Sequence, residues 1–331
     1  MTREADNHFW LSKLRSIAGL QDCDFPSGLE LFGRSSEIEM CLIPEAVSDN
    51  MQEDHAAFEA WCLALQVHCG VHHIQIGLRS NLPISGVHPN RFRYRLATMR
   101  ELFPGLISIA PNSEWLSQPL TESGELRINK SYPRKSPPDL EPWAAMERAK
   151  NGSESQLEFG LEVSSAFRRA FGVSTVMRQW PIGVFENSVK RANELLPRSK
   201  SAIDLVAIGD DQAPLFLFEL KKADNRKAGI VGELLFYTAV MRDVLHRTIT
   251  YEDERAAKHC SLAPADILAR QSIVSVFITN GRHHPLVEQG SILAALNQAT
   301  QAKWIQKPVT FRSAKVTRVP TTSGDDFEFA T

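Results

Sequence analysis

Two short hydrophobic segments in the second half of the chain carry charged residues of types that could do chemistry. Asp204 stands within the apolar sequence AIDLV, and Glu219 and Lys221 stand within LFLFELK. Both segments, residues 201–208 and 215–221, have the length and the β-branched or aromatic content typical of buried strands. Two acids and a lysine on such strands need a reason, because burying a charge without a partner is costly.

The segment that joins them, residues 209–214, contains Gly and Pro and predicts a turn between antiparallel strands. In the simplest register Asp204 lies directly opposite Glu219, with their Cβ atoms about 5 Å apart. Two opposed carboxylates repel each other, and a divalent cation between them makes the arrangement favourable. Carboxylate oxygens are ligands that suit Mg²⁺ or Mn²⁺.

Side chains alternate along a strand, so Glu219 and Lys221 share one face. Phe216, Phe218 and Leu220 then point to the other face and predict a hydrophobic core there. The alternation therefore predicts that both acids and the lysine converge on one side of the strand pair.

A helix predicted at residues 154–172, ended by Gly172, precedes these strands and supplies further acids. Glu154, Glu158 and Glu162 are spaced by four and lie on one helical face. Glu162 is the preferred third acid of the site, since it lies ten residues before Gly172. Glu158 is the second choice.

The remaining patterns indicate an α/β protein, with a mixed sheet flanked by helices in its second half. Further helices are predicted at 227–247 and 291–300, and further strands at 271–280 and 309–319. The first half also has an α/β pattern, with helices predicted at 54–70 and 92–103 and strands at 71–78 and 106–110. The small, polar and acidic tail, residues 321–331, is expected to fray.

An upstream glutamate, then Asp204, then Glu219-Leu220-Lys221 resembles the PD-(D/E)XK nuclease superfamily, whose members have the restriction-endonuclease-like fold. The resemblance covers roughly residues 154–315. Ile203 stands where the family name has proline, which is a common variation.

The helix that contains GELLFY resembles the Gln-x-x-x-Tyr helix of RecB-type members of that superfamily. Glu233 stands in the place of the glutamine and is followed by Tyr237. This departure leaves the subfamily open. Glu233 and Tyr237 either line the site and contact substrate or belong to a helix edge, with Tyr237 packed in the core.

The resemblance implies metal-dependent hydrolysis of phosphodiester bonds. Asp204, Glu219 and the backbone carbonyl of Leu220 would hold Mg²⁺ or Mn²⁺, as one ion or two. Lys221 would orient an attacking water or help to deprotonate it. The implied substrate is nucleic acid, with DNA favoured, and the implied settings are restriction, repair or phage defence.

Three basic residues follow the strand that carries Lys221. Lys222, Arg226 and Lys227 either contact substrate phosphates or are solvated loop charges.

A proline-rich stretch, residues 131–142, predicts a domain boundary near residue 140. Residues 1–140 would form an α/β domain of unknown type that recognises a substrate or a protein partner. Residues 141–331 would form the restriction-endonuclease-like nuclease domain. A homodimer is left open, because many nucleases that cut both strands of a duplex act as dimers.

Composition excludes several function classes. The chain has 331 residues and a net charge of −2, so it is not a generally basic nucleic-acid binder. The sequence has no apolar run long enough to span a membrane, no signal-peptide pattern and an odd number of cysteines, which together predict a cytoplasmic protein. Walker A, dinucleotide-binding and G-x-S-x-G motifs are absent from the sequence.

The alternative function is a catalytically inactive module that retains the nuclease fold and binds nucleic acid or a protein partner. Metal binding discriminates between the two, because only the active enzyme needs the acids to converge on an ion.

Overall fold

The computed structural model describes residues 4–51, 53–80, 83–129, 140–149, 154–198, 201–210, 213–223, 227–254 and 262–330. The chain divides into two units, each built from three separate segments. The first unit comprises Met1–Glu122, Lys227–Phe236 and His284–Lys303, and the second comprises Ser123–Arg226, Tyr237–His283 and Trp304–Thr331. Most of the proline-rich stretch lies outside the described residues, so the boundary near residue 140 stays a prediction.

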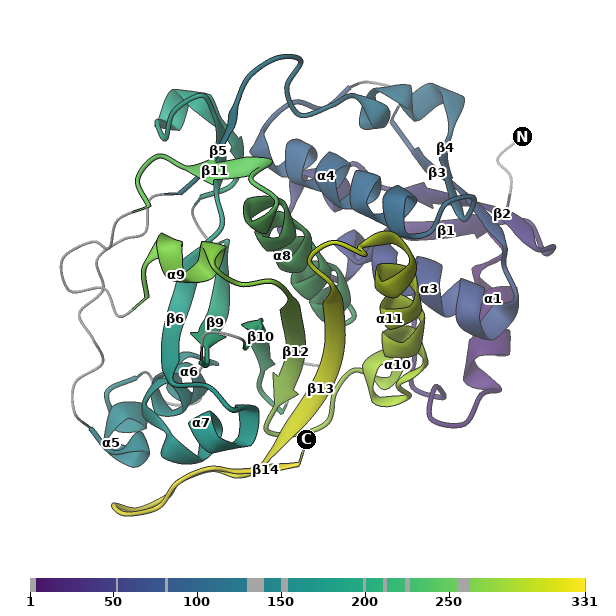
Figure 1. Ribbon diagram of the computed structural model, residues 1–331. Helices are drawn as coiled ribbons and strands as arrows, with labels where there is room; N and C mark the ends of the chain where they lie inside the picture. The colour runs from purple at the N-terminus through teal and green to yellow at the C-terminus, as the bar shows by residue number, and fades with distance from the viewer. Residues whose placement is uncertain are drawn as a thin grey trace. The chain divides into compact units, whose positions relative to one another are not determined.

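The first unit contains a four-stranded sheet in the order β1-β2-β3-β4 (Figure 1). β1 is antiparallel to β2, and the other pairs are parallel. Its strands are β1 (Leu29–Phe32), β2 (Glu37–Leu42), β3 (His73–Leu78) and β4 (Ile107–Ile109). Its helices include α1 (Asn7–Arg15), α2 (Glu45–Ser48), α3 (Phe58–Cys69), α4 (Val87–Leu102), α10 (Pro285–Glu288) and α11 (Ser291–Lys303). Short 3₁₀ helices lie at η1 (Asp54–Ala56) and η2 (Pro111–Ser117).

A buried ion pair joins α3 to α4 in this unit. The Arg95 guanidinium donates to both carboxylate oxygens of Glu59, at 2.6 and 2.5 Å, and to the carbonyl of Ala56. Gly232 packs directly against the pair, since a Cβ atom there would lie 2.6 Å from a Glu59 oxygen. The segment 227–236 is thus held in the first unit by a close approach that only glycine allows.

The second unit is built on a six-stranded mixed sheet in the order β14-β13-β12-β10-β9-β6. Its strands are β6 (Thr175–Pro181), β9 (Ala202–Ile208), β10 (Leu215–Lys221), β12 (Ile273–Thr279), β13 (Val309–Arg318) and β14 (Glu328–Ala330). β10, β12 and β13 run parallel, and β6, β9 and β10 alternate in direction. Figure 1 shows the strands from β6 to β13 succeeding one another in this order. The α/β class predicted from the sequence is confirmed.

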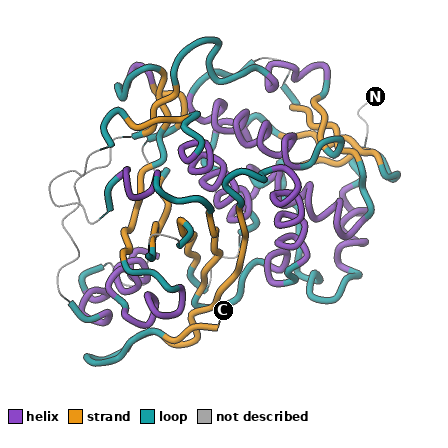
Figure 2. Tube along the Cα trace, viewed as in Figure 1, coloured by secondary structure: helices purple, strands orange, loops and turns teal. Residues whose placement is uncertain are grey.

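Helices α5 (Pro142–Glu147), α6 (Glu154–Val163) and α7 (Ser165–Phe171) lie beside this sheet (Figure 2). Phe216, Phe218 and Leu220 of β10 pack in one core with Leu161 of α6 and Phe167 of α7. The predicted apolar face of β10 is confirmed. Glu219 and Lys221 alternate with these residues along the strand.

The second unit also has a smaller sheet, in the order β11-β5-β7-β8. Its strands are β5 (Leu126–Ile128), β7 (Val184–Glu186), β8 (Glu194–Leu196) and β11 (Ile249–Tyr251). Two short helices, η3 (Arg191–Asn193) and α9 (Pro264–Leu268), complete the unit. The long helix α8 (Gly229–Leu245) gives its first residues to the first unit and the rest to the second. Within the described residues, no helix is both long and apolar enough to cross a bilayer.

The single helix predicted at 154–172 is in fact two helices, α6 and α7. The chain leaves helical geometry at Ser164, whose side chain accepts a hydrogen bond from the Phe167 N–H and so caps α7. Serine is a preferred N-cap because its hydroxyl satisfies one of the donors at a helix start. Gly172 ends α7 with φ +65°, as predicted.

The C-terminal tail does not fray, contrary to the prediction. β14 pairs antiparallel with β13, and Phe327 is buried in the core of the second unit. Asp326 accepts hydrogen bonds from the hydroxyls of Ser164 and Ser165 and from the Ala166 N–H, at the start of α7. A polar residue of the tail therefore helps to cap α7, and the tail itself pairs with β13.

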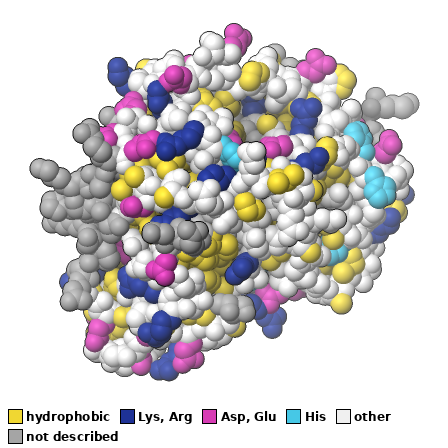
Figure 3. All heavy atoms as spheres, in the orientation of Figure 1, with side chains coloured by type: hydrophobic (Ala, Val, Ile, Leu, Met, Phe, Trp, Pro, Cys, Tyr) yellow, Lys and Arg dark blue, Asp and Glu magenta, His cyan; other side chains and the backbone are white. Residues whose placement is uncertain are grey.

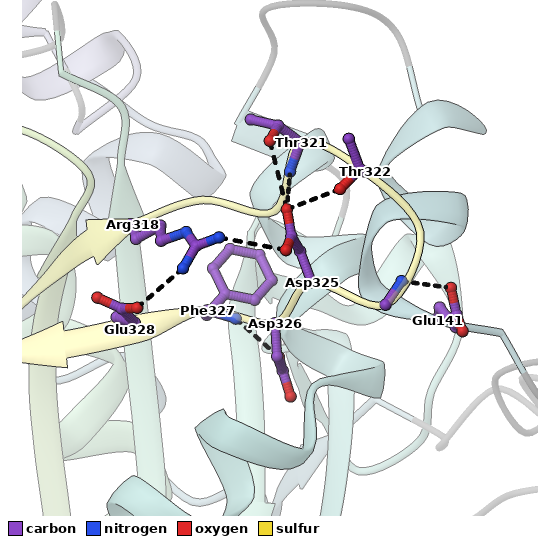
Figure 4. A network of polar contacts seen from close by, with 9 residues as sticks. Glu141, Arg318, Thr321, Thr322, Asp325, Asp326, Phe327 and Glu328 are labelled. Carbon is purple, nitrogen blue, oxygen red and sulfur yellow. Dashed lines mark hydrogen bonds and ion pairs between the residues drawn. The ribbon is translucent and has the colours of Figure 1, made fainter.

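Figure 4 shows the polar contacts that continue this anchor along the tail. Asp325 binds Arg318 and the hydroxyls of Thr321 and Thr322, and Glu141 accepts a hydrogen bond from the Gly324 N–H. Hydrogen bonds lower the pKa of both Asp325 and Glu141 below their ordinary values.

The pKa of Asp326 is also lowered. Burial acts to raise it, but the hydrogen bonds from Ser164, Ala166, Phe327 and Ser165 together outweigh burial. A carboxyl whose pKa is lower in the folded state stabilises the fold above its unfolded pKa, and this contribution is lost as the pH falls through the folded value.

Asp326→Asn is expected to lower the free energy of unfolding by about 1 kcal/mol at pH 7, because the cap of α7 loses its carboxylate acceptor. The difference from wild type should shrink as the pH falls below the ordinary Asp value of 3.8. Urea unfolding followed by circular dichroism at neutral and acidic pH measures both effects. Glu147→Gln, at an exposed acid of α5, is the control. Equal stability of Asp326→Asn and wild type at pH 7 would show that the tail holds without this cap.

Candidate active site

The candidate site lies where β9 and β10 separate. Their register follows the prediction over the four pairs from Leu215–Ile208 to Phe218–Leu205, and the pairing stops there. Asp204 and Glu219 are the next residues along the two strands. Instead of a ladder bond, the Asp204 carboxylate accepts the Leu220 N–H at 2.7 Å. The Asp204 carboxylate therefore lies between the two strands at the point where their pairing ends.

A glutamine of β6 links Asp204 to an acid of α6. The side-chain amide nitrogen of Gln179 lies 2.9 Å from Oε2 of Glu158 and 3.3 Å from Oδ1 of Asp204. Gln179 stands opposite Asp204, between the paired residues Arg178–Leu205 and Trp180–Ile203. Both oxygens of Asp204 therefore have donors, one from each neighbouring strand.

The backbone of Gln179 is unusual for a strand residue. Its φ is +56°, in the left-handed region that residues other than glycine rarely adopt. Such a conformation costs on the order of 1 kcal/mol and persists only where the surroundings impose it. The strained residue is the one whose amide joins the two carboxylates.

Lys221 forms the second half of the site. Its ammonium lies 2.6 Å from Oε1 of Glu219 and 4.0 Å from Oε2 of Glu154, at the start of α6. Glu219 is 1% exposed and Lys221 is 5% exposed. The ion pair is therefore almost fully removed from water, where a charge is expensive unless it is paired.

Of the two upstream acids predicted, the structure brings Glu158 to Asp204 and gives Glu162 to a different partner. Glu162 binds the backbone N–H and the guanidinium of Arg178, at 3.3 and 3.2 Å. The Arg178 guanidinium also covers the ring of Phe159. We therefore take Glu158 as the third acid of the site and Glu162 as the partner of Arg178.

The predicted role of the Leu220 carbonyl as a metal ligand stays a prediction, and the strand geometry gives only the direction of that carbonyl. The N–H and C=O of one strand residue point towards the same neighbouring strand. Because the Leu220 N–H points to Asp204, the Leu220 carbonyl is directed to the same side of β10.

The predicted substrate-contacting residues are distributed between the two units. Lys222 follows β10 in the second unit, and Lys227 belongs to the first unit, where its ammonium lies 3.0 Å from Glu53. Arg226 lies outside the described residues. Glu233 and Tyr237 are both 1% exposed on α8, Glu233 in the first unit and Tyr237 in the second. Their roles towards substrate stay predictions.

The donor set suits a hard divalent cation. The carboxylates of Asp204, Glu158 and Glu219, the amide of Gln179 and the Leu220 carbonyl all offer oxygen, and none offers sulfur or imidazole. In the described part of the chain, no three His, Cys, Asp or Glu side chains are already gathered as a metal site. The residues fit Mg²⁺ or Mn²⁺ by type. Hydrogen-bond donors of the protein hold the carboxylates of Asp204, Glu158 and Glu219 in place.

Sequence reasoning missed Gln179 and did not select Glu154. The stretch from Val173 to Ile182 has the β-branched and aromatic content of a strand, so β6 could have been found. Aligning β6 with β9 would then have placed Gln179 opposite Asp204. An isolated glutamine on an edge strand carries no chemical signature of its own.

Comparison of the chain with protein-family models, with curated proteins and with solved structures gave no match. The resemblance to PD-(D/E)XK nucleases therefore stays a prediction from the sequence.

Lys221→Met is expected to lower the free energy of unfolding by about 3 kcal/mol, because it removes the cation beside the buried Glu219 carboxylate. Glu219→Gln in the same protein should recover more than about 1 kcal/mol, since contacting residues are not additive. A double-mutant cycle by urea unfolding gives this coupling energy. Additive losses would mean that the 2.6 Å pair contributes no net interaction.

Proposed function

We propose that this protein is a metal-dependent nuclease that hydrolyses phosphodiester bonds, with DNA as its substrate. The observation that carries the proposal is the hydrogen bond from the Leu220 N–H to Asp204 at the parting of β9 and β10, since Leu220 stands between Glu219 and its ion-pair partner Lys221. Gln179 joins the same Asp204 to Glu158. Four ionisable side chains from three elements are thus held by hydrogen bonds or an ion pair within the second unit, and Glu158, Glu219 and Lys221 are buried. Burying ionisable groups lowers the free energy of unfolding, and proteins keep such destabilising groups mainly at functional sites.

Asp204, Glu219, Glu158 and the Leu220 carbonyl would hold a divalent cation. When bound, the cation polarises a phosphoryl oxygen and lowers the pKa of a water. Hydrolysis then adds the water oxygen to phosphorus and breaks the bond to the leaving oxygen, which takes up a proton.

Lys221 is suited to the charge that develops in this step. Its ammonium is held 2.6 Å from Glu219 and 4.0 Å from Glu154. A fixed cation in a site with little water stabilises negative charge on the phosphoryl oxygens more than a solvated one does. The same group can donate a hydrogen bond that orients the attacking water. We propose both roles for Lys221.

The order of the elements supports the resemblance to the PD-(D/E)XK nucleases. An acid-bearing helix, α6, is followed by β6, by the Asp204 strand β9 and by the Glu-x-Lys strand β10. On the face drawn in Figure 3, the Lys and Arg side chains are scattered among Asp and Glu. We therefore propose that nucleic acid is bound by local contacts near the site. Restriction, repair and phage defence are the settings proposed for such an enzyme.

A non-catalytic module that binds nucleic acid or a protein partner is the second candidate. One observation favours it: Asp204, Glu158 and Glu219 each bond a donor of the protein, as in a site that has lost its ion. Thermal melting separates the two candidates. A folded cation site raises the melting temperature when MgCl₂ or MnCl₂ is added, and a module without one does not respond.

Asp204→Ala, Lys221→Ala and Glu158→Gln should each lower DNA cleavage in Mg²⁺ by about 100-fold or more, because each removes part of the charge stabilisation at phosphorus. The measurement is single-turnover cleavage of linear and circular duplex DNA, single-stranded DNA and RNA.

Glu147→Gln, at an exposed acid of α5, is the matched control and should cut like wild type. Glu162→Gln tests the assignment of the third acid and should cost much less than Glu158→Gln. If both Asp204→Ala and Lys221→Ala still cleave DNA like wild type, these residues do not form the active site. Wild-type protein that cuts nothing and does not respond to metal in melting would favour the binding module.

A further inference from the structure

The Gln179 amide occupies the place between two carboxylates where a cation would be expected. Its nitrogen lies within hydrogen-bond distance of Glu158 and of Asp204, and these acids come from α6 and β9. An NH₂ group has two hydrogens, so it can donate to both acids at once. The amide thus offsets the repulsion between two acids without carrying a full charge.

The position of this amide is imposed on the chain. Gln179 is held at φ +56° in the middle of β6, opposite the residue whose carboxylate it binds. Backbone strain of this kind concentrates where a side chain must be aimed at a site. The contacts and the strain are independent observations, and both single out Gln179.

We propose that Gln179 is a ligand of the divalent cation and that its amide alternates between two roles. In the cation-free protein the NH₂ group bridges Glu158 and Asp204. With a cation bound, the amide would be turned so that its carbonyl oxygen faces the ion, and Glu158 and Asp204 would both be free to bind that ion. This inference rests on the proposed cation site and adds one residue to it.

The turn needs little space, because the two ends of a glutamine amide are nearly the same size and differ by a donor and an acceptor. A rotation about the last side-chain bond exchanges the two. The same residue can therefore stabilise the acids before the ion binds and coordinate the ion afterwards. A methionine has similar length without either group, and a glutamate keeps the oxygen but loses the donor.

The test compares Gln179→Met and Gln179→Glu with wild type in the full chain. Isothermal titration with MnCl₂ gives the affinity for the cation, and thermal melting without divalent metal gives the stability of the cation-free protein. Gln301→Met and Gln301→Glu, at an exposed position on α11, are the matched controls and should behave like wild type.

Gln179→Met is expected to bind Mn²⁺ about 10- to 100-fold more weakly than wild type. Gln179→Glu is expected to bind Mn²⁺ more tightly than wild type but to melt at a lower temperature without it, since a third carboxylate then faces two others. Circular dichroism checks that both variants are folded. A third readout is the side-chain amide signal of Gln179 in the NMR spectrum of protein labelled with ¹⁵N-glutamine. The signal is assigned because it is missing from the spectrum of Gln179→Met. In wild type this signal should shift when Mg²⁺ is added.

If Gln179→Met binds Mn²⁺ as tightly as wild type, or more tightly, the amide is only a spacer and the inference is wrong. Weaker binding of Mn²⁺ by both Gln179 variants would show that the hydrogen bonds donated to the acids matter, and that the amide oxygen does not bind the ion. This result would also overturn the inference. A wild-type protein that binds no divalent cation would overturn the cation site itself. Cation binding by wild type with unchanged Gln179 variants would overturn only the role of Gln179.

Discussion

The hydrogen bond from the Leu220 N–H to the Asp204 carboxylate is the interaction on which the rest of the site depends. It takes the place of a ladder bond between β9 and β10, so the two strands can part without leaving a buried donor unsatisfied. The Asp204 carboxylate thus lies against a strand whose other face carries Phe216, Phe218 and Leu220. The hydrogen bond also fixes Asp204 at the backbone of Leu220, the residue between Glu219 and Lys221 in β10.

Two kinds of support hold the ionisable groups in place. On one face of the sheet, Phe216, Phe218 and Leu220 pack against α6 and α7 and fix the position of β10. The same packing fixes α6, which delivers Glu154 and Glu158. The tail adds to this support, since Asp326 accepts hydrogen bonds at the start of α7 and Phe327 belongs to the same core. The hydrophobic core therefore sets the geometry of the polar site.

Much of the second unit could be predicted from the sequence, because its signals are local. The register of β9 and β10 follows from strand length and one turn, and the alternation of apolar and charged residues on β10 follows from the strand period. Gly172 ends a helix as expected. The break at Ser164 was missed because the residues on both sides keep a helical pattern, and the capping hydroxyl is recognised only once the fold is known.

The parts that failed depend on partners far away in the chain. The tail is polar and would fray by itself, but α7 and β13 supply the groups that bind it. Gln179 gains its importance from residues 21 and 25 positions away. Glu158 and Glu162 have the same spacing pattern, and only their partners, Gln179 and Arg178, distinguish them. No local pattern contains this information.

The segmentation of the two units has a consequence for how the chain folds. The first unit needs residues 227–236 and 284–303, which are synthesised after most of the second unit. Neither unit can be completed from one continuous stretch, and many of the contacts that stabilise each unit join residues far apart in sequence. Such a topology folds slowly, because long loops must close before the contacts they bring can form. When only the first 140 residues have emerged from the ribosome, the first unit still lacks two of its three segments.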